Sequence, residues 1–461
     1  ANCIDRHLKK YKDKTAIIWV GDDPKVQKKI TYKQLHNEVS KAANALKELG
    51  VKKGDRVTIY LTMIPELAYT MLACARIGAI HSVVFGGFAS TELATRIDDC
   101  QPKLIVSASC GHEVNKIIKY KPLLDKAVEL AKHKVEKCII FQRESHQASL
   151  ITGQDIDWNE AIKNVSSPDP VAVEANHPLY ILYTSGTTGK PKGVVRDNGG
   201  HAVSLNWSMK NIYDVEPGDV YWAASDIGWV VGHSYIVYAP LIYGCTSVLF
   251  EGKPIGTPDA GTFWRIISEY KVSVLFTAPT ALRAVKRDDP NGDFIKKHDL
   301  LSLKSLFLAG ERADPDTVSW LENKLKIPII DHWWQTETGW PVASNPMGIE
   351  VLPIKKGSPT VAMPGYNINV LSEDKIEVGR GSLGAISIKL PLPPGSLPTL
   401  WNADESYIES YLTSFPGYYE TGDAGYQDED GYLYIMSRTD DVINVAGHRL
   451  STGAMEEVLS N

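Results

Sequence analysis

The sequence has few cysteines, and none of them forms a closely spaced pair. Six are scattered over 461 residues, at Cys3, Cys74, Cys100, Cys110, Cys138 and Cys245, and no Cys-x-x-Cys motif occurs. This density excludes a disulfide framework and indicates a reducing compartment. The cytoplasm and the mitochondrial matrix are both reducing enough, so both stay open as the location.

A strong excess of charge is also missing. The 49 Lys and Arg residues against 55 Asp and Glu residues give a formal net charge of −6. A chain with this balance is not a polycation, so we expect no nucleic-acid partner. Hydrophobic residues make up 43% and charged residues 23%, which excludes disorder, collagen and coiled coil as descriptions of the whole chain. At about 150 residues per domain, the length predicts two to three domains.

No signal peptide is visible, and one long stretch lacks charged residues. Residues 227–250 contain no Asp, Glu, Lys or Arg and are long enough to span a bilayer. They also contain Gly228, Gly232, His233, Pro240 and Gly244, which favour a buried passage of strand, loop and helix. We therefore expect no membrane partner. Because the sequence begins with Ala1 rather than Met, a preceding targeting segment stays open.

Apolar runs alternate with amphipathic stretches along most of the chain. Strands are predicted at 56–61, 79–85, 104–107, 137–141, 179–183, 272–276 and 305–309, and helices at 65–77, 123–133 and from about 280. This β-α-β rhythm predicts an α/β fold with parallel sheets flanked by helices. After Gly365, short strands at 368–371, 384–389 and 432–435 lie between turn residues. They predict a smaller β-rich subdomain.

Residues 183–193, which read YTSGTTGKPKG, form the strongest local pattern. They follow a predicted strand, and their three glycines permit close approach of a ligand to the backbone. Hydroxyls, backbone N–H groups and two lysines are suitable partners for phosphate oxygens. The pattern is not a Walker A motif, because Pro191 rather than Ser or Thr follows Lys190. The alternative is a plain solvent-exposed loop, which the preceding strand and the two lysines disfavour.

At these residues the sequence resembles the adenylate-forming superfamily, which includes acyl-CoA synthetases, luciferases and the adenylation domains of peptide synthetases. Further motifs in the family's order are GER at 310–312, DHWWQTETG at 331–339, YETGD at 419–423, SRTDD at 437–441 and NVAGHR at 444–449. The resemblance implies a large AMP-binding domain with α/β subdomains over residues 1–365 and a β-rich subdomain over 366–439. Residues 440–461 are then a hinge and the start of a C-terminal domain that is mostly absent.

The resemblance also implies a two-step reaction. A carboxylate attacks the α-phosphate of ATP and expels pyrophosphate, and the thiolate of CoA then attacks the acyl-adenylate. Both partners of the first step are anionic, so catalysis needs positioning and neutralisation of charge. The expected cofactors are ATP, Mg²⁺ and CoA as a co-substrate, and the remaining small-molecule partner is a short-chain carboxylate.

The motifs assign roles to individual residues by resemblance. We expect Thr184, Lys192, Thr336, Glu337 and Asp440 to be catalytic, with Glu337 as the Mg²⁺ ligand, Thr336 at the α-phosphate and Asp440 as the hinge. ATP and AMP contacts are expected from Thr184, Ser185, Gly186, Thr187, Thr188, Gly189, Lys192, Gly310, Glu311, Arg312, Asp331, His332, Trp333, Trp334, Gln335, Thr336, Asp423, Arg438 and Arg449. Asp423 is the expected ribose ligand, and its alternative is a turn-forming aspartate. Ordinary surface arginines are the alternative for Arg438 and Arg449.

The resemblance further predicts a small acyl pocket. Trp334 stands where short-chain members carry a tryptophan that closes the pocket, and Trp229, Val230 and Val231 resemble its other wall. Ala309 stands where acetate-type relatives usually carry Val, so two methyl groups are missing. A buried methylene is worth about 0.8 kcal/mol and discrimination by one methylene is limited to about 1–3 kcal/mol. We therefore expect propionate to be preferred, with acetate and butyrate tolerated, and an acetate–CoA ligase is the alternative.

CoA contacts are predicted from the same resemblance. The expected residues are Phe85, Gly86, Gly87, Lys116, Val231 and Ala446. Two departures from the family pattern concern ligand contacts: Glu113 lies where acetate-type relatives place phosphate-binding arginines, and Arg312 stands where Pro is usual.

The leading hypothesis is an acid–thiol ligase, a short-chain acyl-CoA synthetase of the propionate type. An adenylation domain that feeds a carrier protein is an alternative that Trp334 and Ala309 disfavour, because they leave no room for an amino-acid side chain. A non-catalytic nucleotide-binding module is another. The sequence ends at Asn461 without the adenylation lysine of the family, so we expect this chain alone to form adenylate poorly.

Overall fold

The computed structural model describes residues 1–114, 116–164, 167–184, 191–311 and 313–439, together with the backbone of 442–445 and 448–451. Several predicted site residues lie outside the described residues, namely Ser185, Gly186, Thr187, Thr188, Gly189, Arg312, Asp440 and Ala446. Arg449 is described only in its backbone, as part of a short strand.

The first large sheet has seven strands in the order β16-β15-β14-β12-β13-β1-β2. Its strands run parallel except for the edge strand β2, which is antiparallel to β1. Their bounds are β1 (Thr15–Val20), β2 (Gln27–Thr31), β12 (Val220–Ala224), β13 (Thr246–Phe250), β14 (Val272–Thr277), β15 (Ser305–Leu308) and β16 (Ile329–Asp331). The crossover helices are α10 (Thr262–Tyr270), α11 (Pro279–Asp288) and α12 (Pro315–Leu325).

The second large sheet also has seven strands, in the order β11-β10-β4-β3-β5-β8-β9. The bounds are β3 (Arg56–Tyr60), β4 (Ile80–Val83), β5 (Leu104–Ala108), β8 (Lys137–Phe141), β9 (Asp155–Asp157), β10 (Pro178–Thr184) and β11 (Lys192–Asp197). Its antiparallel edge hairpin, β10–β11, brackets the predicted phosphate loop. The helices of this part are α1 (Asp5–Tyr11), α2 (Tyr32–Glu48), α3 (Pro65–Ile77), α4 (Ser90–Cys100), α5 (Tyr120–Leu130), α6 (Trp158–Ala161) and α7 (Asn198–Asn211).

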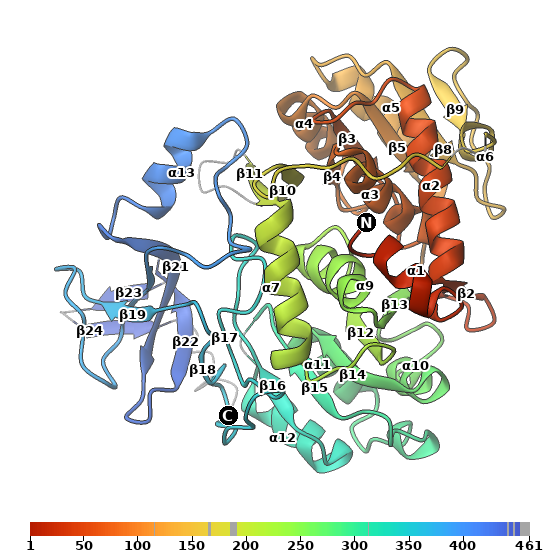
Figure 1. The fold of residues 1–461 in the computed structure, drawn as a ribbon. Coiled ribbons are helices and arrows are strands. Elements are labelled where there is room, and N and C mark those ends of the chain that lie inside the picture. The colour runs from red at the N-terminus through yellow and green to blue at the C-terminus, as the bar shows by residue number, and fades with distance from the viewer. Residues whose placement is uncertain are drawn as a thin grey trace.

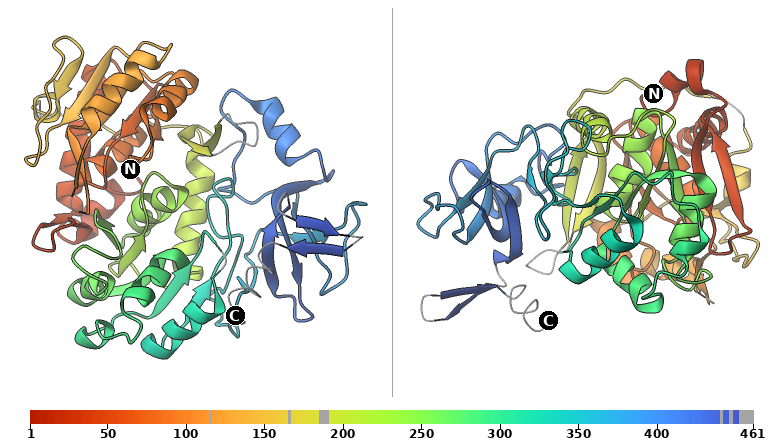
Figure 2. Two further views of the ribbon diagram at one scale, coloured as in Figure 1. Left: turned by 180° about the vertical axis from the view of Figure 1, so that it is seen from behind. Right: turned by 90° about the horizontal axis from the view of Figure 1, so that it is seen from below.

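The C-terminal part forms an antiparallel sheet of four strands, β19-β20-β21-β22, which lies to one side of the two large sheets (Figures 1 and 2). Its elements are β19 (Ile368–Leu371), β20 (Gly384–Lys389), α13 (Asp404–Tyr411), β21 (Tyr418–Gln427) and β22 (Leu433–Arg438). Two-stranded pairs are β6 (Cys110–Glu113) with β7 (Lys116–Lys119), β17 (Ala343–Ser344) with β18 (Val361–Ala362), and β23 (Val442–Val445) with β24 (His448–Ser451). The predicted fold class is confirmed.

The uncharged stretch at 227–250 is folded in a different order from the predicted one. It forms α8 (Val230–Gly232), the π-helix η1 (His233–Tyr238) and α9 (Ala239–Tyr243), and only then β13. Pro240 stands in the first turn of α9, and Gly244 ends it with φ 93°. The helix therefore precedes the strand, and the predicted order was wrong. Within the described residues, no helix is both long and apolar enough to cross a membrane.

A buried cluster of histidine and tyrosine rings lies where η1 meets the second sheet. The ring centroid of His81 on β4 lies 5.5 Å from that of His233 on η1 and 5.5 Å from that of Tyr180 on β10. His81 Nε2 and the Tyr238 hydroxyl are 2.6 Å apart, and His201 of α7 packs edge-on against Tyr180. Burial lowers the pKa of all three histidines, to about 4 for His233. These side chains are therefore neutral in the folded protein at pH 7.

This burial predicts that the folded protein is sensitive to acid. Burial also lowers the pKa of His332 to about 4, whereas an unfolded histidine titrates near pH 6.5. Between these values the unfolded chain binds more protons, so stability falls as the pH drops from about 6.5 towards 4. At pH 5, the buried His233 and the buried His332 should each lower the free energy of unfolding by about 2 kcal/mol.

Urea unfolding at pH 8 and pH 5 measures this effect. The difference between the two pH values should shrink in His233→Asn and stay unchanged in His146→Asn, which replaces a partly exposed histidine. If the difference between pH 8 and pH 5 shrank equally in both variants, burial of His233 would not be the cause of the loss of stability in acid.

Candidate active site

The second signature, residues 331–339, begins at the carboxyl end of β16. Leu308 of β15 pairs with Asp331 of β16, and His332 N–H then donates to Leu308 C=O at 3.0 Å. The His332 ring is 1% exposed, with Nδ1 2.7 Å from Leu308 O and Nε2 3.0 Å from the Tyr213 hydroxyl. Both ring nitrogens are therefore used inside the core. A nucleotide contact from His332 would have to come from its backbone.

Asp423 on β21 is the point where the second signature meets the four-stranded sheet. Its Oδ2 accepts hydrogen bonds from Trp333 Nε1 at 3.1 Å and from Gln335 Nε2 at 2.7 Å. Its Oδ1 accepts one from Arg438 Nη1 at 3.1 Å. Burial raises the pKa of Asp423, and Arg438 opposes that rise. The structure thus brings together four predicted nucleotide residues from two parts of the chain.

Glu337 and Lys192, two predicted catalytic residues, are both held by helix α13. The Tyr411 hydroxyl donates to Glu337 Oε1 at 2.9 Å. The Lys192 ammonium donates to Ser410 Oγ at 3.0 Å and lies 5.0 Å from the centroid of the Tyr411 ring. Tyr411 stacks in turn on Tyr419, with ring centroids 5.4 Å apart and planes 11° apart. Burial and the Glu337 carboxylate both raise the pKa of Tyr411, so its hydroxyl stays protonated.

Sequence reasoning missed Ser410 and Tyr411. They belong to no glycine-rich or charged motif, and the only local signal is that residues 404–411 form a helix just before the YETGD segment. Their contacts with Glu337 and Lys192 span 74 and 218 positions. No spacing rule within one helix could have found them.

Thr184 and Glu311 differ in how free their side chains are. Thr184 lies at the end of β10 opposite Lys192, and its buried Oγ1 has no hydrogen-bond partner among the residues that the structure describes. The Glu311 carboxylate, by contrast, accepts two hydrogen bonds of 2.9 Å from Arg283 and one of 2.6 Å from Thr280 N–H. The hydroxyl of Thr184 is thus available to a ligand, whereas the side chain of Glu311 is committed to α11. Gly310, with φ 100°, lies in open space beside it.

The residues predicted to form the acyl pocket separate into two groups. Trp334 packs edge-on against Tyr235, with ring centroids 5.5 Å apart, and the half-buried Val230 and Val231 pack against the same hydrophobic core as Trp334. Ala309, 6% exposed, follows β15 and belongs to that core.

Trp229 lies apart from this group. It is 47% exposed, and its ring lies 5.2 Å from Phe85 and 6.2 Å from Phe88. Its ring contacts are therefore with the loop predicted to bind CoA.

The predicted CoA residues Gly86 and Lys116 lie in the loop after β4 and at the start of β7. A Cβ on Gly86 would collide with the Tyr120 hydroxyl, so glycine is needed there. Lys116 is exposed at the tip of the β6–β7 hairpin, where it lies opposite Glu113 in the strand register.

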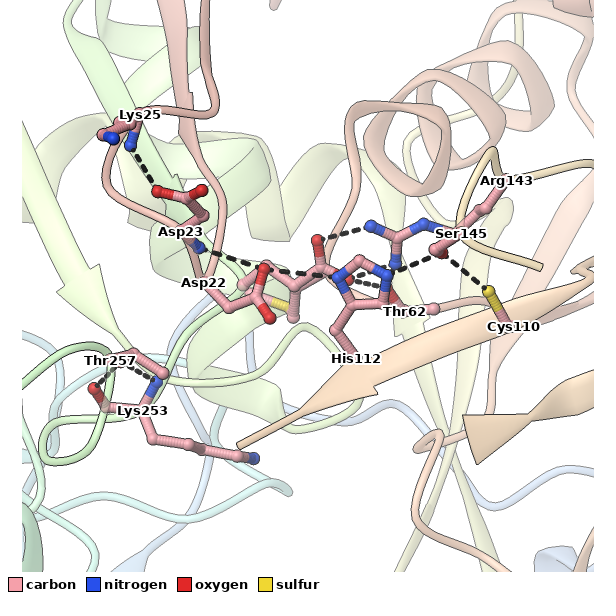
Figure 3. A network of polar contacts seen from close by, with 12 residues as sticks. Asp22, Asp23, Lys25, Thr62, Cys110, His112, Arg143, Ser145, Lys253 and Thr257 are labelled. Atoms are coloured by element: carbon pink, nitrogen blue, oxygen red, sulfur yellow. Dashed lines mark hydrogen bonds and ion pairs between the residues drawn. The ribbon is translucent and has the colours of Figure 1, made fainter. Parts of the chain in front are cut away.

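A polar network anchors the β6–β7 hairpin (Figure 3). His112 Nδ1 lies 3.2 Å from Asp22 Oδ1, and His112 Nε2 lies 2.7 Å from Ser145 Oγ. Beside it, the largely buried Arg143 pairs with Glu251, with 2.9 Å between Nη2 and Oε2. The hairpin that carries Lys116 is thus tied to the β1–β2 turn and to the loop after β8.

Comparison with known proteins agrees with this architecture. Residues 4–392 match the AMP-binding enzyme family, and the chain belongs to this family. A human protein, acyl-CoA synthetase short-chain family member 3, mitochondrial, is 51% identical over 459 residues, which are 99% of this chain and 67% of that protein. Propionate–CoA ligase of Escherichia coli is 48% identical over 464 residues, which are 100% of this chain and 73% of that protein. The predicted resemblance to short-chain acyl-CoA synthetases, and with it the enzyme class of acid–thiol ligases, is confirmed.

The bond between Tyr411 and Glu337 predicts a cost in stability when the hydroxyl is removed. Tyr411→Phe should lower the free energy of unfolding by about 1 kcal/mol, because a partly buried carboxylate loses a hydrogen-bond donor. Urea unfolding measures the change. Tyr407→Phe is the matched control on the same helix, because its ring packs on Tyr411 and it makes no bond to Glu337. An equal loss in both variants would contradict a contribution from the bond.

Proposed function

We propose that this protein ligates a short-chain carboxylic acid to CoA through an acyl-adenylate and releases AMP and pyrophosphate. The observation that carries the proposal is a chain of contacts between predicted site residues. Thr184 at the end of β10 pairs with Lys192, helix α13 holds both Lys192 and Glu337, and Asp423 binds the same loop after β16 through Gln335. In parallel α/β sheets, ligands bind at such strand ends. The family match and the relatives support the same reaction class.

The first step joins two anions, the acid and the triphosphate. The hydroxyl of Thr184 is buried and has no partner within the described ranges, and the ammonium of Lys192 is held by the neutral Ser410, so both side chains are suited to bind the departing phosphates. Asp423 is suited to the ribose hydroxyls because it is fixed by three donors and still offers carboxylate lone pairs. The protein thus contributes mainly orientation and positive charge.

Glu337 is the residue that we propose as the Mg²⁺ ligand. Mg²⁺ is usually bound by one or two carboxylates together with substrate phosphates. Glu337 fits this pattern, because its Oε1 is oriented by the Tyr411 hydroxyl and the Lys192 ammonium lies over the face of the same tyrosine ring. When bound, the ion neutralises charge on the phosphates. Among the described residues, no group of three or more His, Cys, Asp or Glu side chains that could hold a metal ion occurs.

For the acid, we propose propionate as the preferred substrate, with acetate and butyrate tolerated. Ala309 and Trp334 follow the neighbouring strands β15 and β16 and belong to one hydrophobic cluster. A valine at position 309 would fill volume that a third carbon of the acid needs. The E. coli relative named propionate–CoA ligase supports this choice.

For CoA, we propose the surface formed by Phe85, Gly86, Gly87, Lys116 and Val231, with Trp229 as an added wall. The exposed ring of Trp229 against Phe85 supports this surface. Cytoplasm and mitochondrial matrix both fit the reducing environment that the unpaired cysteines indicate.

The pocket assignment predicts a change of preference in Ala309→Val. In the complete protein, the ratio of kcat/KM for propionate over acetate should fall by about tenfold, which corresponds to the 1–3 kcal/mol available from one or two methylenes. Competition between the two acids measures the ratio. The control Ala313→Val, at another buried alanine outside this cluster, should leave the ratio unchanged. A wild-type preference for acetate would favour the acetate–CoA ligase instead.

The role of Glu337 predicts a specific dependence on Mg²⁺. Glu337→Gln in the complete protein should raise the Mg²⁺ concentration for half-maximal propionate-dependent ATP–pyrophosphate exchange by about tenfold or more. The exposed Glu350→Gln is the control and should behave as wild type. If Glu337→Gln left the Mg²⁺ dependence unchanged, Glu337 would not be the ligand.

A further inference from the structure

Arg196, which no sequence motif indicated, is a fully buried cation that binds the signature loop directly. It lies on β11 at 0% exposure. Its Nη1 donates to Glu337 C=O at 3.0 Å and to Gly395 C=O, and its Nη2 donates to Thr336 C=O. Its Nε donates to the Tyr180 hydroxyl at 3.2 Å. One guanidinium therefore holds two consecutive carbonyl groups of the loop that carries Thr336 and Glu337.

The acceptors of Arg196 are unusual for a buried arginine. Within the described part of the chain it forms no ion pair with a carboxylate, and its partners are carbonyl and hydroxyl oxygens. Arg76, another buried arginine, instead pairs with both oxygens of Asp5 at 2.9 Å. An arginine cannot be deprotonated in a protein, and a buried unpaired charge is costly. A residue kept at such a cost, with two of its acceptors on the signature loop, indicates a function beyond packing.

One glycine leaves room for this guanidinium, and a second supplies a carbonyl that it binds. Gly339 has φ 76°, and a Cβ there would lie 2.6 Å from Arg196 Cζ. Gly395 has φ 89° and supplies one of the acceptor carbonyls. From the other side, Leu397 N–H also donates to Glu337 C=O at 2.8 Å. The backbone of Glu337 is thus held by two independent donors.

Strand β11 connects Arg196 to the phosphate-binding residues. Lys192 and Arg196 are four positions apart on the same strand, so their side chains leave the same face. Lys192 reaches Ser410 and Tyr411, beside the Glu337 carboxylate, while Arg196 binds the Glu337 backbone. A single strand therefore fixes the position of Lys192 relative to the signature loop.

We propose that Arg196 is a positioning residue for the adenylation step, which holds the Thr336–Glu337 backbone so that the Thr336 hydroxyl and the Glu337 carboxylate face the Mg²⁺-bound triphosphate. This inference rests on the proposed function, and it adds a residue that acts through the backbone of the loop. The guanidinium shape matters as well as the charge, because three carbonyls at fixed angles need a planar fork of donors.

The test uses Arg196→Gln and Arg196→Lys in the complete protein, with Arg76→Gln as the matched control. Arg196→Gln should lower kcat/KM for MgATP by about 100-fold, because the reacting groups are misplaced. The same variant should raise the half-saturating Mg²⁺ concentration by about tenfold. Its KM for CoA should stay within about twofold of the wild-type value, because the proposed CoA surface does not include the signature loop. Arg196→Lys should show the same changes in a weaker form. If Arg196→Gln does not fold, the same kinetic constants are measured on Arg196→Lys instead. Arg76→Gln should lower the melting temperature and leave all these kinetic constants unchanged.

A double mutant separates positioning from general stability. If Arg196 acts through Glu337, Arg196→Gln should cost much less in a Glu337→Gln background than in wild type. Wild-type Mg²⁺ dependence in both Arg196 variants, or losses that multiply fully in the double mutant, would overturn the inference. A normal Mg²⁺ dependence of Glu337→Gln alone would instead overturn the proposed role of Glu337, so the two failures are distinguishable.

Discussion

The site depends on the parallel pairing of β15 with β16. This register places the ends of the two strands side by side, so that Ala309 and the signature loop begin at one edge of the sheet. Buried hydrogen bonds of His332 to Leu308 and Tyr213 then hold the start of the loop. Loops have little stability of their own, and a site for anions needs polar groups fixed in advance. The sheet supplies that rigidity.

Polar contacts then join the parts of the chain that no sheet connects. The four-stranded sheet is bound to the signature loop through Asp423, which Trp333 and Gln335 reach from the large domain. Helix α13 adds the contacts to Glu337 and Lys192. Because each of these side chains is at least partly buried, losing one partner would leave the other without its hydrogen bond. The polar residues of the candidate site therefore also hold the four-stranded sheet to the signature loop.

The neutral histidines and tyrosines beside Arg196 show a related constraint. Burial lowers the pKa of His201 and His233, and the guanidinium of Arg196 lowers both further. Burial, with a smaller contribution from this fixed positive charge, thus keeps the two histidines uncharged at pH 7. The same charge lies behind the loop that is proposed to meet a triphosphate, where positive potential is favourable.

The sequence by itself determined the α/β rhythm, the helix that begins at Pro65 and ends at Gly78, and the membership of a family, because local periodicity and contiguous motifs carry that information. It also indicated Thr184, Lys192, Glu337 and Asp423. Only the tertiary structure decided that Glu311 and the His332 ring are committed to the protein itself, and that Trp229 packs on Phe85. The same holds for Tyr411 and Arg196, whose bonds to Glu337 span 74 and 141 positions. Such contacts depend on how separate elements pack, and no local pattern records that packing.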